Sequence, residues 1–229
     1  MRLLPQIPAQ PDNIMTMMDR YDDTSYSIKD YVKLKIPMPS LLENAVNKRH
    51  SEYISGRLCA REALMKLTGS TLTPDMASDR SPLWPQGVCG SISHSHNVVI
   101  TIVANNTDYL TLGIDIEKVM TEKTAKEIYQ QFMESSEEGC YEDMYTFAEK
   151  VTIQFTIKEA IFKALYPLIN KRFYYEAVRL ISINESEASL KLMMDLSDDW
   201  KKDDELKVEY EINDDWVCSI LKLPNHSNK

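Results

Sequence analysis

The chain has 229 residues, enough to bury a sizeable core in one large domain or two small ones. Hydrophobic residues make up 43% and charged residues 27%, with only 6 Gly and 10 Pro, so the composition indicates a folded globular protein and excludes a fibrous or disordered one. The net charge of -9 disfavours a general binder of DNA or RNA unless the basic residues gather on one face. We therefore expect no nucleic-acid partner.

The N-terminal segment lacks the apolar stretch of a signal peptide, because Pro5, Pro8 and Pro11 interrupt it, and no later run reaches membrane-spanning length. We therefore expect a cytoplasmic protein with no membrane partner. The cysteines are far apart and form no CxxC pair, which argues against a zinc knuckle or a disulfide scaffold and predicts free thiols. They are Cys59, Cys89, Cys140 and Cys218.

The first clear element is a helical stretch, either one helix or an interrupted one, that starts at Ser40 and reaches Leu67. The residues Ser40 to Glu43 have capping-box spacing, and Gly69 is placed to end the helix. Residues 87–104 alternate and then run apolar in β-branched residues, which predicts a strand pair. Thr111 to Glu117 predicts another strand.

The second half repeats this arrangement of a helix followed by strands. Thr124 to Glu127 is another capping-box match, and a helical apolar pattern runs from Phe147 to Tyr166, where Pro167 ends it. Four strands separated by acidic turns follow as a β meander. They are expected at Ala177–Asn184, Ala188–Asp195, Leu206–Ile212 and Trp216–Leu223. The fold class is therefore α/β (α+β), with a hint of duplication.

A pair of carboxylates lies two residues apart on the predicted strand Thr111 to Glu117. On a strand, Asp115 and Glu117 project to one face while Ile114 and Ile116 project to the other. Two adjacent carboxylates repel each other, and Mg²⁺ is a hard cation that relieves the repulsion and bridges substrate phosphates. The alternative is an exposed strand edge whose acids merely face water.

A third carboxylate lies on the predicted helix Phe147 to Tyr166. Glu159 and Lys163 are four residues apart and share one helix face, while Phe155 and Phe162 share another. A metal ligand one turn from a lysine suits a pyrophosphate, because the metal and the ammonium can divide its oxygens between them. A plain surface ion pair is the alternative.

Hydroxyls and imidazoles alternate along the residues from Gly90 to His96. Ser91, Ser93 and Ser95 share one face of an extended chain, and His94 and His96 share the other. Such groups can bind phosphate oxygens. A hydrolytic triad is disfavoured, since the chain has no Gly-x-Ser-x-Gly elbow. A half-exposed polar strand is the alternative.

The first predicted helix carries a basic strip on an otherwise acidic protein. Arg57 and Arg61 are one turn apart, and Lys48 and Arg49 lie two turns earlier. Arginine pairs with phosphate through two hydrogen bonds, so the strip could bind a phosphorylated nucleotide or an acidic partner. Solvated helix charges are the alternative.

Taken together, in this order and at this spacing, these motifs resemble the Sfp-type 4′-phosphopantetheinyl transferases, in particular the subgroup of the enterobactin-synthesis type. The likeness covers roughly Lys48 to Lys171. The motifs are a GRxxAR-like segment (Gly56 to Arg61), Pro82-x-Trp84-Pro85, Gly90 to His94, Gly113 to Glu117, and Lys158-Glu159-Ala160 with Lys163.

The resemblance implies a pseudo-two-fold fold of two similar halves, 1–110 and 111–229, each with a helix on a small, mostly antiparallel sheet and with the active site in the cleft between them. It implies transfer of the 4′-phosphopantetheine group from coenzyme A to a serine of an apo acyl, peptidyl or aryl carrier protein, releasing adenosine 3′,5′-bisphosphate. Mg²⁺, or alternatively Mn²⁺, would be the cofactor and a monomer the expected state. Siderophore, polyketide and fatty-acid carriers all remain open.

The resemblance also implies roles for particular residues. Asp115, Glu117 and Glu159 would bind the metal, and Asp115 would thereby also contribute to binding coenzyme A. The phosphates would be bound by Lys158, Lys163 and Ser93, with Glu159 and Lys163 counted as catalytic. The 3′-phosphate and adenosine would be bound by His94, Arg49 and Arg57.

The general base and two further positions remain open. Glu137 lies where the family often has a catalytic glutamate, but Glu159 and a hydroxide on the metal compete with it, and the neighbouring Glu134 and Glu138 make the register ambiguous. Where many members have a phosphate-binding lysine, this chain has Arg80. Where a Trp is common before the Lys-Glu pair, it has Phe155.

Two other functions compete with the transferase. One is a binding module that holds coenzyme A or a carrier protein without turnover. The other is a different carboxylate-metal phosphotransferase or nuclease, which the net negative charge disfavours.

Overall fold

The computed structural model describes residues 4–141, 145–213 and 215–225. Its internal contacts divide the chain into two units. Unit 1 contains Leu4, Gln10–Leu112 and residues 224–225, and unit 2 contains Gly113–Leu223 together with Pro5–Ala9.

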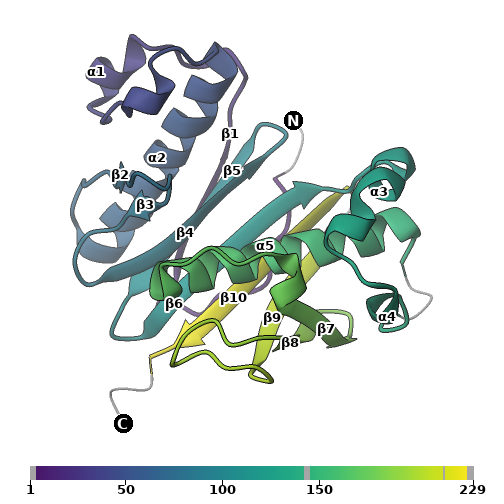
Figure 1. Cartoon of the computed structure of the whole chain (residues 1–229). Coiled ribbons are helices and arrows are strands. Elements are labelled where there is room, and N and C mark those ends of the chain that lie inside the picture. Colours follow the sequence, from purple (N-terminus) through teal and green to yellow (C-terminus); the bar gives the residue numbers. More distant parts are fainter. Residues whose placement is uncertain (1–3, 142–144, 214, 226–229) are drawn as a thin grey trace. The chain divides into compact units, whose positions relative to one another are not determined.

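In unit 1, one long helix packs on a three-stranded antiparallel sheet (Figure 1). The sheet has the order β1-β5-β4, and helix α2 (Asn47–Thr68) lies against its central strand. The three strands are β1 (Met15–Arg20), β4 (Val88–Ser95) and β5 (Val98–Asn105). The smaller elements are α1 (Asp30–Leu34), the 3-10 helix η1 (Ser40–Leu42), β2 (Asp75–Met76) and β3 (Pro82–Leu83).

The start of α2 differs from the sequence prediction. The residues from Ser40 to Leu42 form only a 3-10 turn, and the Ser40 side chain caps no helix. Val46 then adopts an extended backbone with ψ 157°, so the helix proper begins at Asn47. The predicted end is confirmed, since Gly69 adopts the left-handed conformation with φ 72° and its N–H bonds to a carbonyl of the last turn.

The predicted strand pair at 87–104 is confirmed as the hairpin β4–β5. The turn consists of His96 and Asn97, both with positive φ (44° and 65°), which matches the twist of a two-residue hairpin. Every residue of β5 from Val98 to Ala104 is buried. A fully buried run of β-branched residues is typical of a central strand, and β5 occupies the centre of this sheet.

Unit 2 contains a five-stranded sheet with the order β6-β10-β9-β8-β7. The last four strands pair antiparallel in sequence order, so the predicted meander is confirmed. Strand β6 (Tyr109–Lys118), which begins in the last residues of unit 1, lies beside β10 and contains the predicted carboxylate pair. The other strands are β7 (Val178–Ile183), β8 (Glu187–Leu192), β9 (Glu205–Asn213) and β10 (Trp216–Pro224).

Helix α5 (Phe147–Ile169) covers this sheet (Figure 1). Thr146 and Glu149 form a reciprocal capping box at its start. The helix runs three residues beyond the predicted end at Tyr166, because Pro167 falls in the last turn, where it removes only one intrahelical hydrogen bond. Asn170, with φ 54°, then ends it.

The remaining elements of unit 2 are short. Helix α3 is capped by Thr121, whose side chain accepts from the N–H of Thr124, so the capping residue lies three positions before the predicted one. The short elements are α3 (Glu122–Ile128), η2 (Tyr129–Gln131), α4 (Ser135–Glu138) and η3 (Tyr175–Ala177). Among the described residues, no helix is both long and apolar enough to span a bilayer.

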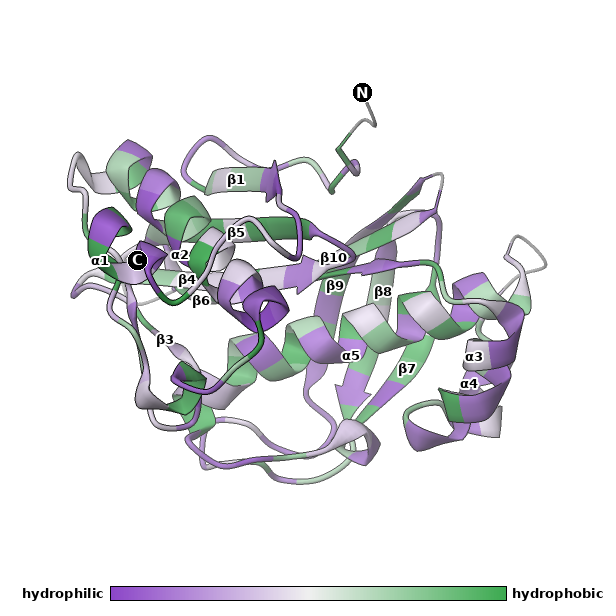
Figure 2. Cartoon of the chain, turned by 90° about the horizontal axis from the view of Figure 1, so that it is seen from above, coloured by the Kyte–Doolittle hydropathy of each residue, from purple (hydrophilic) through white to green (hydrophobic). Residues whose placement is uncertain are grey.

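Each unit thus combines one long helix with an antiparallel sheet, and the predicted α+β class is confirmed. Figure 2 shows hydrophobic residues along β5 in unit 1 and recurring along α5 in unit 2. The core of unit 2 is built largely from the buried side of α5 and the inner faces of the meander strands.

Candidate functional site

A close approach between β6 and α5 brings the two predicted site motifs of unit 2 together. A Cβ on Gly113 would lie 2.0 Å from the carbonyl oxygen of Ala160, so only glycine lets the strand run this near the helix. Two residues further on, Oδ1 of Asp115 accepts a hydrogen bond of 2.6 Å from Nζ of Lys163. The same ammonium donates to the carbonyl of Ile114 at 3.1 Å.

The carboxylates of this site are more buried than those of the exposed strand edge that the sequence left open as an alternative. Asp115 is only 4% exposed, and Ile114 and Ile116 are fully buried. Glu117 and Glu159 are half-buried. Asp115 is therefore an interior acid compensated by a lysine, rather than a carboxylate that merely faces water.

Glu159 has a hydrogen-bond partner that the sequence did not indicate. The hydroxyl of Tyr175 donates to Oε1 of Glu159. The ring of Tyr175 packs near Phe132 and Phe155, at centroid distances of 5.8 and 6.3 Å. Burial first, then the neighbouring charges of Glu159 and Asp115, raise the pKa of Tyr175. Tyr175 thus lies close to two of the three predicted metal ligands, yet no sequence motif marks it.

The three carboxylates fit a magnesium site in their chemistry but are not gathered into one. Within the described residues, no three or more His, Cys, Asp or Glu side chains are close enough together to hold a metal ion. Asp115 is directed to Lys163 and Glu159 to Tyr175. The donors are all oxygen atoms, as Mg²⁺ prefers. Ligation by Asp115, Glu117 and Glu159 stays a prediction.

Glu137 and Lys158 lie together in the interior of unit 2. Their side chains are 1% and 3% exposed, and the ammonium lies 3.0 Å from Oε1 of Glu137. Burial lowers the pKa of Lys158, with the charge of Glu137 opposing the shift. The structure therefore places a predicted base and a predicted phosphate ligand in a buried ion pair with each other.

A pocket of about 180 Å³ lies beside Glu159. Aromatic side chains make up much of its wall, and Tyr174 is 67% exposed at this surface. The pocket-lining residues are Lys158, Glu159, Phe162, Arg172, Phe173, Tyr174, Tyr175 and Val178.

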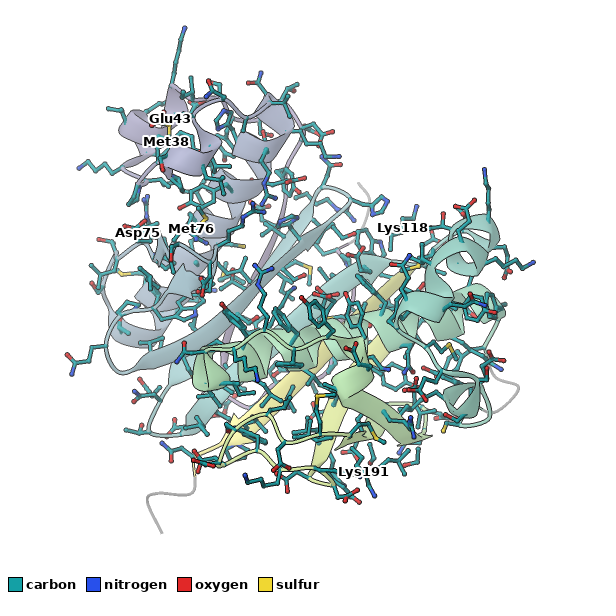
Figure 3. All side chains as sticks on the ribbon, viewed as in Figure 1. Met38, Glu43, Asp75, Met76, Lys118 and Lys191 are labelled. Atoms are coloured by element: carbon teal, nitrogen blue, oxygen red, sulfur yellow. The ribbon has the colours of Figure 1, made fainter. Side chains whose placement is uncertain are left out.

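Unit 1 has a separate pocket of about 140 Å³ whose polar lining is mostly basic. Arg57, only 5% exposed, lies 4.5 Å above the ring centroid of Tyr53 and donates from Nη2 to the carbonyl of Asp75. Figure 3 labels Asp75 and its neighbour Met76, which also lines the pocket, beside α2. The polar lining residues are Arg49, Glu52, Tyr53, Arg57, Arg80 and His94.

Three of the four predicted coenzyme A ligands of unit 1 therefore line one pocket, namely Arg49, Arg57 and His94. Ser93 does not, because residues alternate along β4 and its buried side chain points to the other face of the sheet. Arg80 lines the pocket too.

Arg61 of the predicted basic strip has a structural task. It donates to Thr73 and to the carbonyls of Leu34 and Lys35. These bonds tie the end of α1 and the segment after α2 to α2 itself.

Comparison with known proteins identifies the family. Residues 38–104 match the 4′-phosphopantetheinyl transferase N-terminal domain, and residues 111–221 match the 4′-phosphopantetheinyl transferase superfamily. Enterobactin synthase component D of Salmonella typhimurium is 30% identical over 173 residues, which is 75% of this chain and 71% of that protein. The chain belongs to the 4′-phosphopantetheinyl transferase superfamily.

Other members of the superfamily are similar over most of their length. Enterobactin synthase component D of Escherichia coli K12 is 31% identical over 145 residues, covering 63% of this chain and 67% of that protein. The 4′-phosphopantetheinyl transferase Npt of Nocardia iowensis is 25% identical over 146 residues, covering 61% and 62%. The predicted family and the predicted transferase class are confirmed, with coenzyme A as the substrate and carrier proteins as the acceptors of this superfamily.

Proposed function

We propose that this transferase moves the 4′-phosphopantetheine group of coenzyme A onto a serine of an apo carrier protein. The contact between Lys163 of α5 and Asp115 of β6 supports the proposal best. It joins two motifs that are 48 residues apart in the sequence and that the family resemblance assigns to a single phosphate-binding site.

The basic pocket of unit 1 would bind the 3′-phosphate and the adenosine. Arg57 is rigidly placed by Tyr53 and by the Asp75 carbonyl, while Arg49 is 46% exposed and bonded to Glu52. Guanidinium groups bind phosphate through paired hydrogen bonds, and His94 adds a ring donor at the same pocket. Arg80 would occupy the place of the usual phosphate-binding lysine.

The pyrophosphate would be bound at the end of β6 in unit 2. Asp115, Glu117 and Glu159 would hold Mg²⁺, or Mn²⁺, which when bound neutralises phosphate charge and orients the reacting group. Lys163 would donate to a phosphate oxygen in exchange for its present bond to Asp115. Ser93 is also predicted to bind a phosphate. Its side chain is buried on the face of β4 opposite His94, which gives that role less support.

In the reaction, the oxygen of the carrier serine would attack the phosphorus joined to pantetheine. The bond from that phosphorus to the adenosine 3′,5′-bisphosphate would break, and the serine proton would pass to a base. The half-buried Glu159 is better placed for this than Glu137, whose carboxylate is 1% exposed. The protein would contribute mainly positioning and charge stabilisation.

For the acceptor, we propose a carrier of a siderophore synthase. The names of the most similar relatives reported above refer to enterobactin synthesis, whereas Npt carries only the name of the reaction.

The test is to incubate the purified protein with coenzyme A, Mg²⁺ and a panel of apo carriers from siderophore, polyketide and fatty-acid systems, and to measure the intact mass of each carrier. We expect a gain of one phosphopantetheine group, lost when EDTA replaces Mg²⁺ or when the acceptor serine is alanine. Coenzyme A binding without a mass gain on any carrier would favour the non-catalytic binding module instead.

A further inference from the structure

The carboxylate of Glu137 is fully occupied by donors from its own chain. Oε1 accepts from Nε2 of Gln154 and from the backbone N–H of Leu180, both at 2.7 Å. Oε2 accepts from the backbone N–H of Glu134 at 2.8 Å and from Nζ of Lys158 at 3.1 Å. A carboxylate offers about four acceptor sites, so four donors leave none for the proton of a substrate hydroxyl.

The partners of Glu137 are themselves fixed. The carbonyl Oε1 of Gln154 accepts from the hydroxyl of Tyr141 at 2.7 Å, which orients the amide so that its NH₂ group points to Glu137. Tyr141 is 6% exposed, and burial followed by the charge of Glu137 raises its pKa well above the usual range. The acid therefore lies in a closed network of buried groups with matched donors and acceptors.

This network joins three elements of unit 2. Glu137 comes from α4, Lys158 from α5, and Leu180 from β7. Lys158 directly precedes Glu159, so its anchored side chain fixes the turn of α5 that presents Glu159. Leu180 lies five residues after Tyr175, so its bond to Glu137 fixes the strand that follows the tyrosine.

We infer that Glu137 and Lys158 are a positioning pair that contacts neither coenzyme A nor the carrier, and that orients Glu159 and Tyr175 for the transfer. The inference rests on the proposed function and replaces the roles that the family resemblance implied for these two residues. Glu137 is then not the general base, and Lys158 is not a phosphate ligand.

The physics of buried ion pairs provides a test that separates this role from a chemical one. Removing one partner leaves an uncompensated buried charge, whereas removing both charges together is close to neutral. A positioning pair can therefore be rescued by a second substitution. A missing base or phosphate ligand cannot, because no second change restores the lost group.

The experiment compares the wild type with Glu137→Gln (E137Q), Lys158→Met (K158M) and the double variant E137Q/K158M. Glutamine keeps one carbonyl oxygen for the N–H of Leu180 and for Gln154, and methionine keeps the length of the lysine stem. Each single variant is expected to lower Tm by about 10 °C. Each single variant is also expected to lower kcat by about 100-fold, since a displacement of the reacting groups by about 1 Å lowers the rate by that factor.

In the double variant, Tm and kcat should both rise above those of the single variants, although the amide NH₂ that replaces Oε2 cannot accept from the N–H of Glu134 and keeps the recovery partial. The pH profile of kcat/KM should keep its acidic limb in E137Q, because a residue that does not contact the substrate leaves the base of the reaction in place. The exposed neighbour Glu138 provides the control, and E138Q should change neither Tm nor kcat.

The inference is overturned by a double variant that melts no higher than the single variants, or that stays as slow as E137Q. Loss of the acidic limb in E137Q overturns it as well. These results are distinct from failure of the proposed function, which would be a wild-type protein that modifies no carrier. If only E137Q fails to fold, K158M and the double variant still decide the question.

Discussion

The two charged sites of this transferase are built in opposite ways. In the pocket of unit 1, the buried guanidinium of Arg57 lies over the ring of Tyr53 and donates to the backbone carbonyl of Asp75, and among the described residues it forms no ion pair. In unit 2, Asp115 is paired with Lys163 and Glu137 with Lys158, each at 3.0 Å or less. The unit 1 pocket offers the charge of Arg57 to a ligand, although its Arg49 is paired with Glu52 at 2.8 Å, while the unit 2 site holds its charges in internal pairs.

The difference indicates which step each site controls. A pocket already arranged for an anion needs little rearrangement, so it contributes directly to the affinity for coenzyme A. A site whose charges pair with each other must exchange those partners for substrate and metal, so its residues act mainly on the rate of transfer. Substitutions in unit 1 should therefore change KM for coenzyme A, and those in unit 2 should change kcat.

The largest effect is expected from Asp115→Asn. The change removes a proposed metal ligand and leaves the ammonium of Lys163 without its partner at 2.6 Å. We expect kcat to fall by about 100- to 1000-fold at saturating coenzyme A. Because Asp115 is 4% exposed, thermal melting must accompany the kinetics to show that the variant is folded. The fully exposed Asp198 gives the control D198N, and activity of D115N within twofold of D198N would contradict the assignment.

A smaller and different effect is expected from Arg57→Gln. Loss of a charged hydrogen bond to the 3′-phosphate should raise KM for coenzyme A by about 10- to 100-fold with kcat nearly unchanged. The sharper measurement uses dephospho-coenzyme A, which lacks that phosphate. The wild type should discriminate strongly between the two donors and R57Q should not, whereas K66Q, an exposed change on the same helix, should behave as the wild type. Equal discrimination by R57Q would place the 3′-phosphate elsewhere.

Much of the fold could be predicted from local sequence. The β-branched run from Val98 to Val103 and the alternation in the last four strands indicate their strands directly. Strand β1 was missed because Met15–Arg20 contains one β-branched residue and is fixed by pairing with β5, about 80 residues away along the chain. The start of α2 was misplaced because a capping-box spacing at Ser40 indicates a helix start without fixing the backbone at Val46.

The sequence offers candidate site residues, but it does not predict their contacts. Helical spacing correctly gives Glu159 and Lys163 one face of α5, which suggests an ion pair between them. In the structure Lys163 bonds to Asp115, and Glu159 accepts from Tyr175. These hydrogen-bond partners lie on other elements of the fold. The periodicity of side chains along one strand or one helix carries no information about them.

The smallest effect is expected at Tyr175. This residue is the hydrogen-bond partner that Glu159 would keep when a metal binds, so it tests whether unit 2 is arranged for the metal. Its hydroxyl donates a hydrogen bond to Oε1 of Glu159, which leaves Oε2 for the metal ion. Its ring is fixed against Phe132 and Phe155, so the hydrogen bond sets the rotation of the carboxylate. Partners that orient ligands in this way contribute to metal affinity.

We therefore expect Tyr175→Phe to weaken Mg²⁺ binding by about 10-fold while the aromatic packing and Tm stay close to those of the wild type. Calorimetric titration of the protein with Mg²⁺ in the absence of coenzyme A measures this without relying on turnover. The adjacent Tyr174, which is 67% exposed, gives the matched control Y174F. Tighter Mg²⁺ binding by Y175F would mean that the hydroxyl competes with the metal for Glu159. The hydrogen bond from Tyr175 would then oppose metal binding in unit 2 instead of orienting a ligand for it.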